Sequence, residues 1–454
     1  MTGPLTLTFL GANGTVTGSK HLIDDGHVQV LVDCGLFQGY KQLRLRNWQD
    51  LPLPARALDA IVLTHAHIDH SGYLPVLARA GYRGAVYCTP ATAALCEVLL
   101  PDAGHLQELD AGYANRHGFS RHHPALPLYT ADDARRALEL LRPVEPGERF
   151  KLPGGLHATF TRAGHILGAA CVTVEAGGRT TLFSGDLGRD HDVIMDPPEP
   201  RPAADVVVME ATYGDRLHDP GDPAEALGAA VRRTVERGGV VLIPAFSVGR
   251  TQTLLVLLHR LRAAGKIPEI PIHVDSPMAT SVTGLYARHA REHRLDIATC
   301  RAVFDDISYT RDVTASQEID RRGGPCVVIS ASGMATGGRV VHHLKRFAPG
   351  PENMILLAGF QAGGTRGAAL AAGATSVKIH GQHVPVRAEV ARLDSLSAHA
   401  DQRELLAWLG AGPRPRQIFL VHGEPDALDA LRVAIREQLG WDATVPDYRD
   451  IVDL

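Results

Sequence analysis

Short apolar runs dominate both ends of the chain, whereas the middle alternates between two periodicities. In the outer parts, runs of strand length follow one another, and several end beside histidine, aspartate or glycine. In the middle, apolar runs such as residues 239–244 alternate with helical patterns such as residues 251–264. Strands that alternate with helices are typical of a parallel sheet with helices on both faces. We therefore predict an α/β protein in which residues 211–392 form an inserted domain, and residues 1–210 and 393–454 form the domain that receives it.

The hydrophobic pattern also predicts elements of the outer domain. Residues 90–100 have a helical pattern, and a final strand is expected near residues 444–449. Ser71 is placed to cap a helix that extends to residue 79. Residues 103–142 are polar and contain several histidines without ligand spacing. A solvated helical surface is the preferred interpretation of this polar segment, and phosphate contacts are the alternative.

The most informative stretch follows residues 60–63, which have the length and β-branched content of a buried strand. The next seven residues include His65, His67, Asp69 and His70. Imidazole and carboxylate are ligands of zinc-like ions, and a turn lets side chains two residues apart converge. His65 and His67 can serve one ion, while Asp69 and His70 serve a second. A chance cluster is the alternative in a chain with 23 histidines, but four ligand-type residues so close together at a strand end argue against it.

Further ligand-type side chains stand where other predicted strands or segments end. They are His165, Asp186, Glu210, His399 and His422. Singly, such residues are more often structural than metal-binding. Together with the first cluster they predict a metal site, and the two oxygens of Asp186 allow that carboxylate to bridge two ions.

Asp33 follows the predicted strand at residues 27–32. Metal sites usually need an acceptor that orients a ligating histidine, and Asp33 is placed to supply one. An ordinary turn aspartate is the equal alternative, and the sequence alone leaves both open.

Loops at the predicted strand ends of the inserted domain carry serine, glycine and arginine. Such loops expose backbone N–H groups that suit phosphate, although none matches a P-loop. Each loop is more often structural when taken alone, but several on one sheet edge favour a groove for a polyanion. The candidate substrate-binding residues are Ser247, Arg250, Ser332, Arg339 and Arg366.

Composition narrows the class of protein. The 454 residues are 45% hydrophobic and 21% charged, as in a globular protein of two or three domains. The net charge is −4, so any nucleic acid must bind a local basic patch. Six scattered cysteines indicate reduced thiols. The sequence has no signal-peptide pattern and no apolar run of membrane-spanning length, so we expect no membrane association and a cytoplasmic location.

The order of these candidate residues along the chain resembles the pattern of the metallo-β-lactamase superfamily, and more narrowly that of its β-CASP nuclease branch. The superfamily pattern is carried by Asp33, the block from His65 to His70, His165 and Asp186. The branch pattern is carried by Glu210, by His399 in Ser-Ala-His-Ala-Asp and by His422 in Val-His-Gly-Glu. The resemblance covers nearly the whole chain and implies an αββα sandwich with an inserted β-CASP domain.

The resemblance also implies roles for these residues. His65, His67 and His165 would hold one Zn²⁺, and Asp69, His70 and His422 would hold a second. Asp186 would bridge the two, and Asp33 would support the ligands from behind. His399, oriented by Glu210, would be the general acid, so that these two residues and Asp69 count as catalytic.

The activity implied is a zinc-dependent ribonuclease of the compact bacterial form, similar to the eukaryotic endonuclease that processes pre-mRNA 3′ ends. An activated hydroxide between two Zn²⁺ ions, which Mn²⁺ can replace in vitro, would leave 5′-phosphate and 3′-hydroxyl ends. The family's RNA-processing members keep the last metal histidine, here His422, so RNA is expected, with single strands favoured. Endonuclease action is preferred, 5′-exonuclease action is also compatible, and a homodimer is left open.

Other classes of function compete with this interpretation. A small-molecule hydrolase of the same fold, acting on thioesters or lactones, needs only a small lid, so the large insertion argues against it. A di-iron redox protein usually has glutamate where this chain has His67. A non-catalytic scaffold would have lost metal ligands, and this chain keeps all seven.

Overall fold

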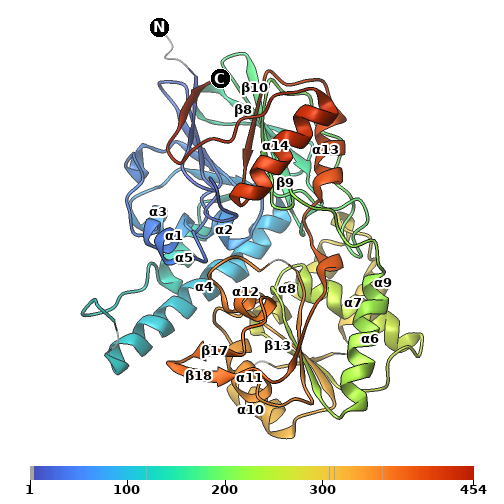
Figure 1. Ribbon diagram of the computed structural model, residues 1–454. Helices are drawn as coiled ribbons and strands as arrows, with labels where there is room; N and C mark the ends of the chain where they lie inside the picture. Colours follow the sequence, from blue (N-terminus) through green and yellow to red (C-terminus); the bar gives the residue numbers. More distant parts are fainter. Residues whose placement is uncertain (1–4, 119, 306, 311, 360) are drawn as a thin grey trace. The chain divides into compact units, whose positions relative to one another are not determined.

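A computed structural model describes residues 5–454 except 119, 306, 311 and 360. The chain forms two compact units (Figure 1). Unit 1 comprises Met1–Leu217 and His399–Leu454, and unit 2 comprises His218–Ala398. The chain leaves unit 1 after Leu217 and returns to it at His399. Both boundaries lie a few residues beyond those expected after residues 210 and 392. Both units combine helices with sheets, so the predicted α/β class is confirmed.

In the described residues, unit 1 contains two sheets. The first has the order β21 (Ile451–Asp453), β1 (Thr6–Phe9), β2 (His21–Asp24), β3 (Gln29–Val32), β4 (Ala60–Val62), β5 (Ala85–Cys88) and β6 (Leu141–Pro143). The second has the order β20 (Gln417–Val421), β11 (Val206–Glu210), β10 (Arg179–Phe183), β9 (Ala170–Ala176), β8 (His157–Arg162) and β7 (Arg149–Lys151). Side chains from both sheets, among them Phe9, Val62, Phe160 and Val208, form one buried core. Alternate apolar positions therefore face inward, as two packed sheets require.

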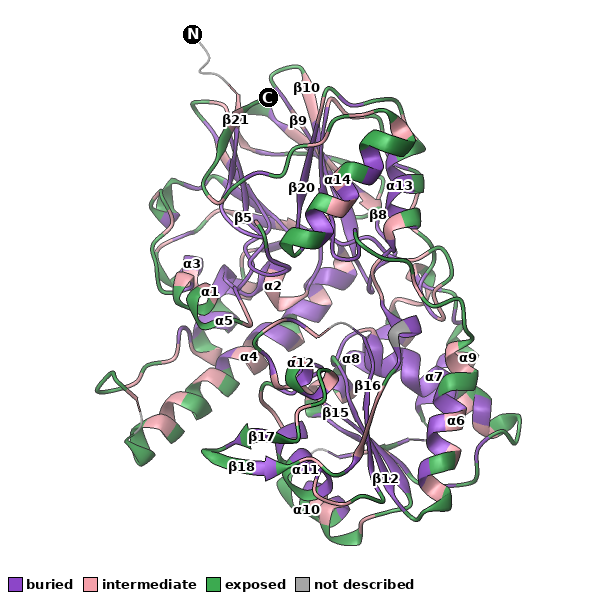
Figure 2. Ribbon diagram, in the orientation of Figure 1, coloured by how far each residue is buried: buried purple, intermediate pink, exposed green. Residues whose placement is uncertain are grey.

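Helices cover the outer faces of unit 1 (Figure 2). They are α1 (Lys41–Arg46), α2 (Ile68–Ser71), α3 (Leu74–Arg79), α4 (Pro90–His117), α5 (Ala131–Leu138), α13 (Gln402–Gly410) and α14 (Pro425–Leu439). All of them except α1 have buried positions, while exposed positions are mostly charged or polar.

Three predicted elements of unit 1 need correction. Helix α4 does not stop at residue 100 but continues through Pro101 to His117, where Gly118 in the left-handed conformation ends it. Ser71 is not an N-cap, because its hydroxyl donates to the carbonyls of Ala66 and His67 and α2 already begins at Ile68. The last strand is β21 rather than residues 444–449, where Thr444 makes only an isolated bridge to Phe419.

Unit 2 is built on a parallel sheet, as predicted from its alternating pattern. Its described strands have the order β14 (Ser308–Tyr309), β13 (Ile272–Asp275), β15 (Cys326–Ser330), β12 (Val240–Pro244), β16 (Met354–Leu357) and β19 (Glu389–Arg392), and each neighbouring pair is parallel. The surrounding helices are α6 (Pro223–Glu236), α7 (Arg250–Ala263), α8 (Pro277–Arg288), α9 (Ile297–Phe304), α10 (Val313–Arg322), α11 (Val340–Phe347) and α12 (Arg366–Ala371). A separate hairpin, β17 (Ser376–Ile379) and β18 (Gln382–Pro385), was not predicted from the sequence.

None of the helices in the described part of the chain combines the length and apolarity that a membrane crossing demands. All six cysteines are buried and unbridged.

Candidate metal centre

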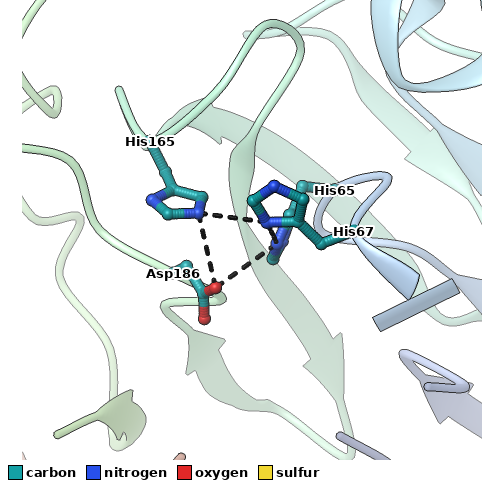
Figure 3. A group of neighbouring side chains, drawn as sticks. All are labelled: His65, His67, His165 and Asp186. Atoms are coloured by element: carbon teal, nitrogen blue, oxygen red, sulfur yellow. Dashed lines mark hydrogen bonds and ion pairs between the residues drawn. The ribbon is translucent and has the colours of Figure 1, made fainter. Parts of the chain in front are cut away.

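Four side chains from three loops of unit 1 converge on one point (Figure 3). His65 and His67 follow β4, His165 follows β8, and Asp186 follows β10. One ligand atom of each lies within 4.8 Å of the others. Nδ1 of His67 is 3.2 Å from Nε2 of His65 and 3.2 Å from Nε2 of His165. Three imidazoles and a carboxylate with this convergence are a donor set that suits a zinc-like ion.

A second group lies on the other side of the Asp186 carboxylate. Asp69, His70 and His422 also place one ligand atom each within 4.8 Å of one another. Oδ1 of Asp186 is 3.3 Å from Nε2 of His70 and 3.4 Å from Nδ1 of His422, whereas Oδ2 is 3.4 Å from Nε2 of His65. The two carboxylate oxygens therefore face different groups of candidate ligands, which is the arrangement a bridging carboxylate needs.

Buried atoms without hydrogen-bond partners test whether these residues fit a metal. Among the described residues, Nε2 of His70, Nε2 of His422 and Oδ1 of Asp186 are buried and lack a hydrogen-bond partner within the protein. An unsatisfied buried polar group is costly, and three of them aimed at one place fit a cation-binding site.

At His67, His165 and Asp186, electrostatics favours the protonation states that bind metal, whereas Asp186 and Asp33 overcome burial and raise the pKa of His70. Burial lowers the pKa of His67 to about 3, reinforced by the neighbouring His65, and burial likewise lowers the pKa of His165. Burial alone would raise the pKa of Asp186, but the facing His422, His70 and His65 outweigh it and hold that pKa well below its ordinary value. Neutral imidazoles and an ionised carboxylate are the forms that coordinate metal.

Unusual backbone features hold the loops that carry the candidate ligands. A Cβ atom on Gly35 would lie only 1.5 Å from the carbonyl oxygen of Asp69, so only glycine lets the two loops touch. His422 adopts a φ of 49°, and Asp33 a φ of 59°, which are uncommon for residues with a side chain. Such conformations concentrate at functional sites.

Polar side chains behind the cluster hold the imidazoles in place. Oδ2 of Asp33 lies 2.7 Å from Nδ1 of His70, so that Nε2 of His70 is turned toward Asp186. The hydroxyl of Thr64 lies 3.1 Å from Nδ1 of His65, and that of Thr212 lies 3.1 Å from Nδ1 of His422. Of the two interpretations left open for Asp33, its contact with His70 favours the supporting role. Sequence reasoning missed both threonines, although Thr64 directly precedes His65.

His399 lies at the rim of the cluster. Its Nδ1 is 3.1 Å from Oε2 of Glu210 and 4.0 Å from Oδ2 of Asp186. The His399 side chain is 18% exposed, whereas that of Asp186 is 2% exposed. Burial would lower the pKa of His399, but the Glu210 carboxylate overcomes this effect and raises it to about 9. The imidazolium is therefore the favoured form of His399, and it lies beside the candidate metal ligands.

The candidate phosphate-binding residues all belong to unit 2 and follow the carboxyl ends of its strands or begin the next helix. Their side chains interact with other residues of unit 2 or are buried in it. Arg366 donates to the carbonyls of Lys378, Ala335 and Thr336. Arg339 donates to Asp275 and to the carbonyl of Thr310. Ser247 lies against Ser276, Ser332 lies against Thr336, and Arg250 is buried at the start of α7. Their contact with phosphate stays a prediction.

Comparisons with known proteins match the same regions. The metallo-beta-lactamase superfamily model matches residues 17–229, the Beta-Casp domain model residues 251–370, and the model of the Zn-dependent metallo-hydrolase RNA specificity domain residues 383–446. The chain is 41% identical to Ribonuclease TTHA0252 of Thermus thermophilus, over 93% of this chain and 94% of that protein. It is 30% identical to Transcription termination factor FttA of Methanosarcina mazei, over 95% of this chain and 69% of that protein. A solved structure of a protein of unknown function from Enterococcus faecalis covers the whole chain with a TM-score of 0.52 at 13% identity, which supports the fold alone.

Proposed function

Because the chain belongs to the β-CASP branch of the metallo-β-lactamase superfamily, we propose that it is a zinc-dependent ribonuclease that leaves 5′-phosphate and 3′-hydroxyl ends. One observation carries the proposal: the Asp186 carboxylate stands between two groups of candidate ligands in a chain 41% identical to a named ribonuclease. The coarser statement, a metal-dependent hydrolase, follows from family membership itself. The number and identity of the ions belong to the proposal.

His65, His67 and His165 would hold one ion, Asp69, His70 and His422 the other, and Asp186 both. When bound, a pair of metal ions supplies hydroxide at neutral pH and neutralises the charge of the phosphodiester. The protein's own contribution is to fix these ligands. Asp33, Thr64 and Thr212 do so through the three contacts described above.

His399 would protonate the leaving 3′ oxygen. A general acid must carry a proton and reach the leaving group. The contact of Nδ1 with Glu210 favours the imidazolium, the form that can give up a proton. Glu210 itself is buried, and its Oε1 accepts from the backbone N–H of Leu187, so the carboxylate that orients His399 is fixed.

We favour cleavage within single-stranded RNA, with 5′-exonuclease action as an additional mode. Phosphates next to the cleaved bond would contact the loops of unit 2 that carry Ser247, Ser332 and Arg366. These loops follow strands of a parallel sheet at their carboxyl ends, where α/β proteins bind ligands.

Parallel assays on RNA and on a thioester test the proposal. The wild-type protein loaded with zinc is expected to cleave a 5′-labelled RNA and to leave the thioester intact. Asp186→Ala should lose RNA cleavage, while Arg432→Gln, an exposed change on α14, should keep it. Thioester hydrolysis without RNA cleavage would replace the ribonuclease by a small-molecule hydrolase of the same fold.

A further inference from the structure

The charge of the chain is distributed unevenly. Residues 321–388 contain a single acidic residue, Glu352, although the whole chain has a net charge of −4. The same stretch contains eight lysines and arginines, at positions 321, 322, 339, 345, 346, 366, 378 and 387. A local excess of positive charge in an acidic protein is the electrostatic signature of a polyanion-binding surface.

The fold gathers part of this charge on one face of unit 2. The apolar sides of α11 and of the β17–β18 hairpin share one buried core, which includes Leu344, Val377 and Val384. The opposite sides are exposed, and Figure 2 colours most of the hairpin accordingly. The rings of His342 on α11 and His380 on the hairpin lie 5.0 Å apart, and the backbone of Arg387 donates to Ala348 just after α11. We define the cationic face as Lys345, Lys378, Arg387, His342, His380 and His383, all of which are exposed.

Several cations elsewhere on unit 2 are paired with carboxylates. Arg233 and Arg237 pair with Glu389, and Lys266 pairs with Glu225. Among the described residues, Lys345, Lys378 and Arg387 have no ion-pair partner. The nearby Asp320 is already in contact with Nδ1 of the buried His343. Within the described residues, the charges of Lys345, Lys378 and Arg387 are therefore not compensated by an ion pair.

Interaction with a helix end accounts for only one of these charges, that of Lys345. Lys345 stands in the last turn of α11, where a cation also interacts favourably with the helix dipole. Lys378 and His383 face each other across a hairpin, which has no comparable dipole. Burial lowers the pKa of His342, and the neighbouring His380, His343 and Lys345 lower it further, whereas Asp320 raises it.

We propose that the cationic face binds the phosphate backbone of a single-stranded RNA segment outside the hydrolytic site. The inference rests on the proposed ribonuclease function for the identity of the polyanion. The face offers point charges and imidazoles but no exposed aromatic side chain, so it would contact phosphates without selecting bases. A long RNA would then be held at two places, and a short one only at the hydrolytic site.

Removal of three charges tests the proposal. The patch variant carries Lys345→Gln, Lys378→Gln and Arg387→Gln. The control variant carries Arg149→Gln, Arg432→Gln and Arg436→Gln, three exposed changes on unit 1 that remove the same net charge. Binding is measured by fluorescence anisotropy in an Asp186→Ala background, and cleavage is measured with the zinc-loaded protein.

For an RNA of about 40 nucleotides, the patch variant should bind about tenfold more weakly, and the slope of log K against log salt should flatten by about 2, since each phosphate contact on a single strand contributes about 0.7. In the cleavage assay its KM should rise by a similar factor at unchanged kcat. An RNA of about six nucleotides has few phosphates besides those next to the cleaved bond, so it should show neither change. The control variant should behave as the wild type with both.

Equal affinity and equal salt slope for the patch and control variants would overturn the inference. An equal loss with short and long RNA would also overturn it, because it would place these residues at the hydrolytic site or report a folding defect. If the wild type cleaved no RNA but its binding still depended on the patch, the ribonuclease proposal would fall and the cationic face would stand.

Discussion

Nδ1 of His399 lies 3.1 Å from Oε2 of Glu210, a residue 189 positions earlier in the chain. Glu210 ends β11, and His399 stands where the chain re-enters unit 1. The pair therefore joins the two sequence segments of the unit at the rim of the candidate metal centre. This contact supports the general-acid role proposed for His399, because a nearby carboxylate favours the protonated imidazole.

Replacement of His399 should separate proton transfer from metal binding. His399→Asn is expected to lower kcat by about 10²–10⁴-fold, the usual contribution of general acid catalysis. The zinc content and the KM for RNA should stay near those of the wild type, because the proposed ligands are untouched. Steady-state kinetics and metal analysis check this, with the exposed His117→Asn as control. Loss of zinc from His399→Asn would show that the residue is a ligand instead.

Asp33→Asn should weaken metal binding without removing a proposed ligand. The Asp33 carboxylate holds Nδ1 of His70 and the backbone and hydroxyl of Thr64. Loss of such a supporting partner typically costs about 10–100-fold in metal affinity. Competition with a zinc chelator measures the effect, and the exposed Asp50→Asn is the control. Unchanged affinity would mean that Asp33 is an ordinary turn residue after all.

Gly35→Ala should disturb the same loop through packing. The added methyl would lie 1.5 Å from the Asp69 carbonyl oxygen, which is backbone and cannot yield easily. We expect a loss of about 3 kcal/mol in the free energy of unfolding, at the upper end of overpacking effects, together with weaker zinc binding. Gly112→Ala, in α4 with open space around it, should be neutral or slightly stabilising. Denaturant unfolding compares the two, and equal effects would contradict the packing argument.

The chain's candidate ligands could be predicted because their signal is local. Each follows an apolar run of strand length, and strand ends on one side of a fold meet. Thr64 and Thr212 could not be predicted with them, because a threonine hydroxyl becomes informative only when its distance from an imidazole is known. The fold class was predictable for the same reason as the ligands, since it depends on short-range periodicity.

Elements that depend on tertiary packing could not be predicted from the sequence. A helix was expected over residues 90–100, yet α4 continues to His117 and packs against α5, where Gly104 lies against the backbone of Thr130 and Ala131. Pro446 interrupts the expected final strand because it has no N–H to donate, and β1 pairs with Ile451–Asp453 instead. The cationic face could not be predicted either, because it depends on the β17–β18 hairpin, which the sequence did not indicate.

A buried charge network in unit 2 should make its stability depend on pH. Nε2 of His343 lies 2.7 Å from Asp275, and Nδ1 lies 2.7 Å from Asp320, so both ring nitrogens donate and the imidazolium is the favoured form. Burial opposes this charge, but the two carboxylates raise the pKa of His343 to about 9. Because the folded-state pKa lies above the ordinary value of about 6.5, the stabilisation is complete below that pH and is lost as the pH rises toward 9.

Denaturant unfolding of the wild type and His343→Gln at several pH values measures this linkage. The difference in unfolding free energy between the two proteins should shrink as the pH rises from about 6.5 to about 9. A difference that stays constant or grows over this range would show that His343 is neutral in the folded protein.

The central claim is that the cluster around Asp186 hydrolyses RNA with bound metal. Mass spectrometry of the products from a single-stranded RNA, before and after chelation and restoration of zinc, tests it most directly. The account predicts fragments with 5′-phosphate and 3′-hydroxyl ends, produced only with zinc and not by Asp186→Ala. Fragments that end in 2′,3′-cyclic phosphate, or the same fragments from the metal-free protein, would contradict it.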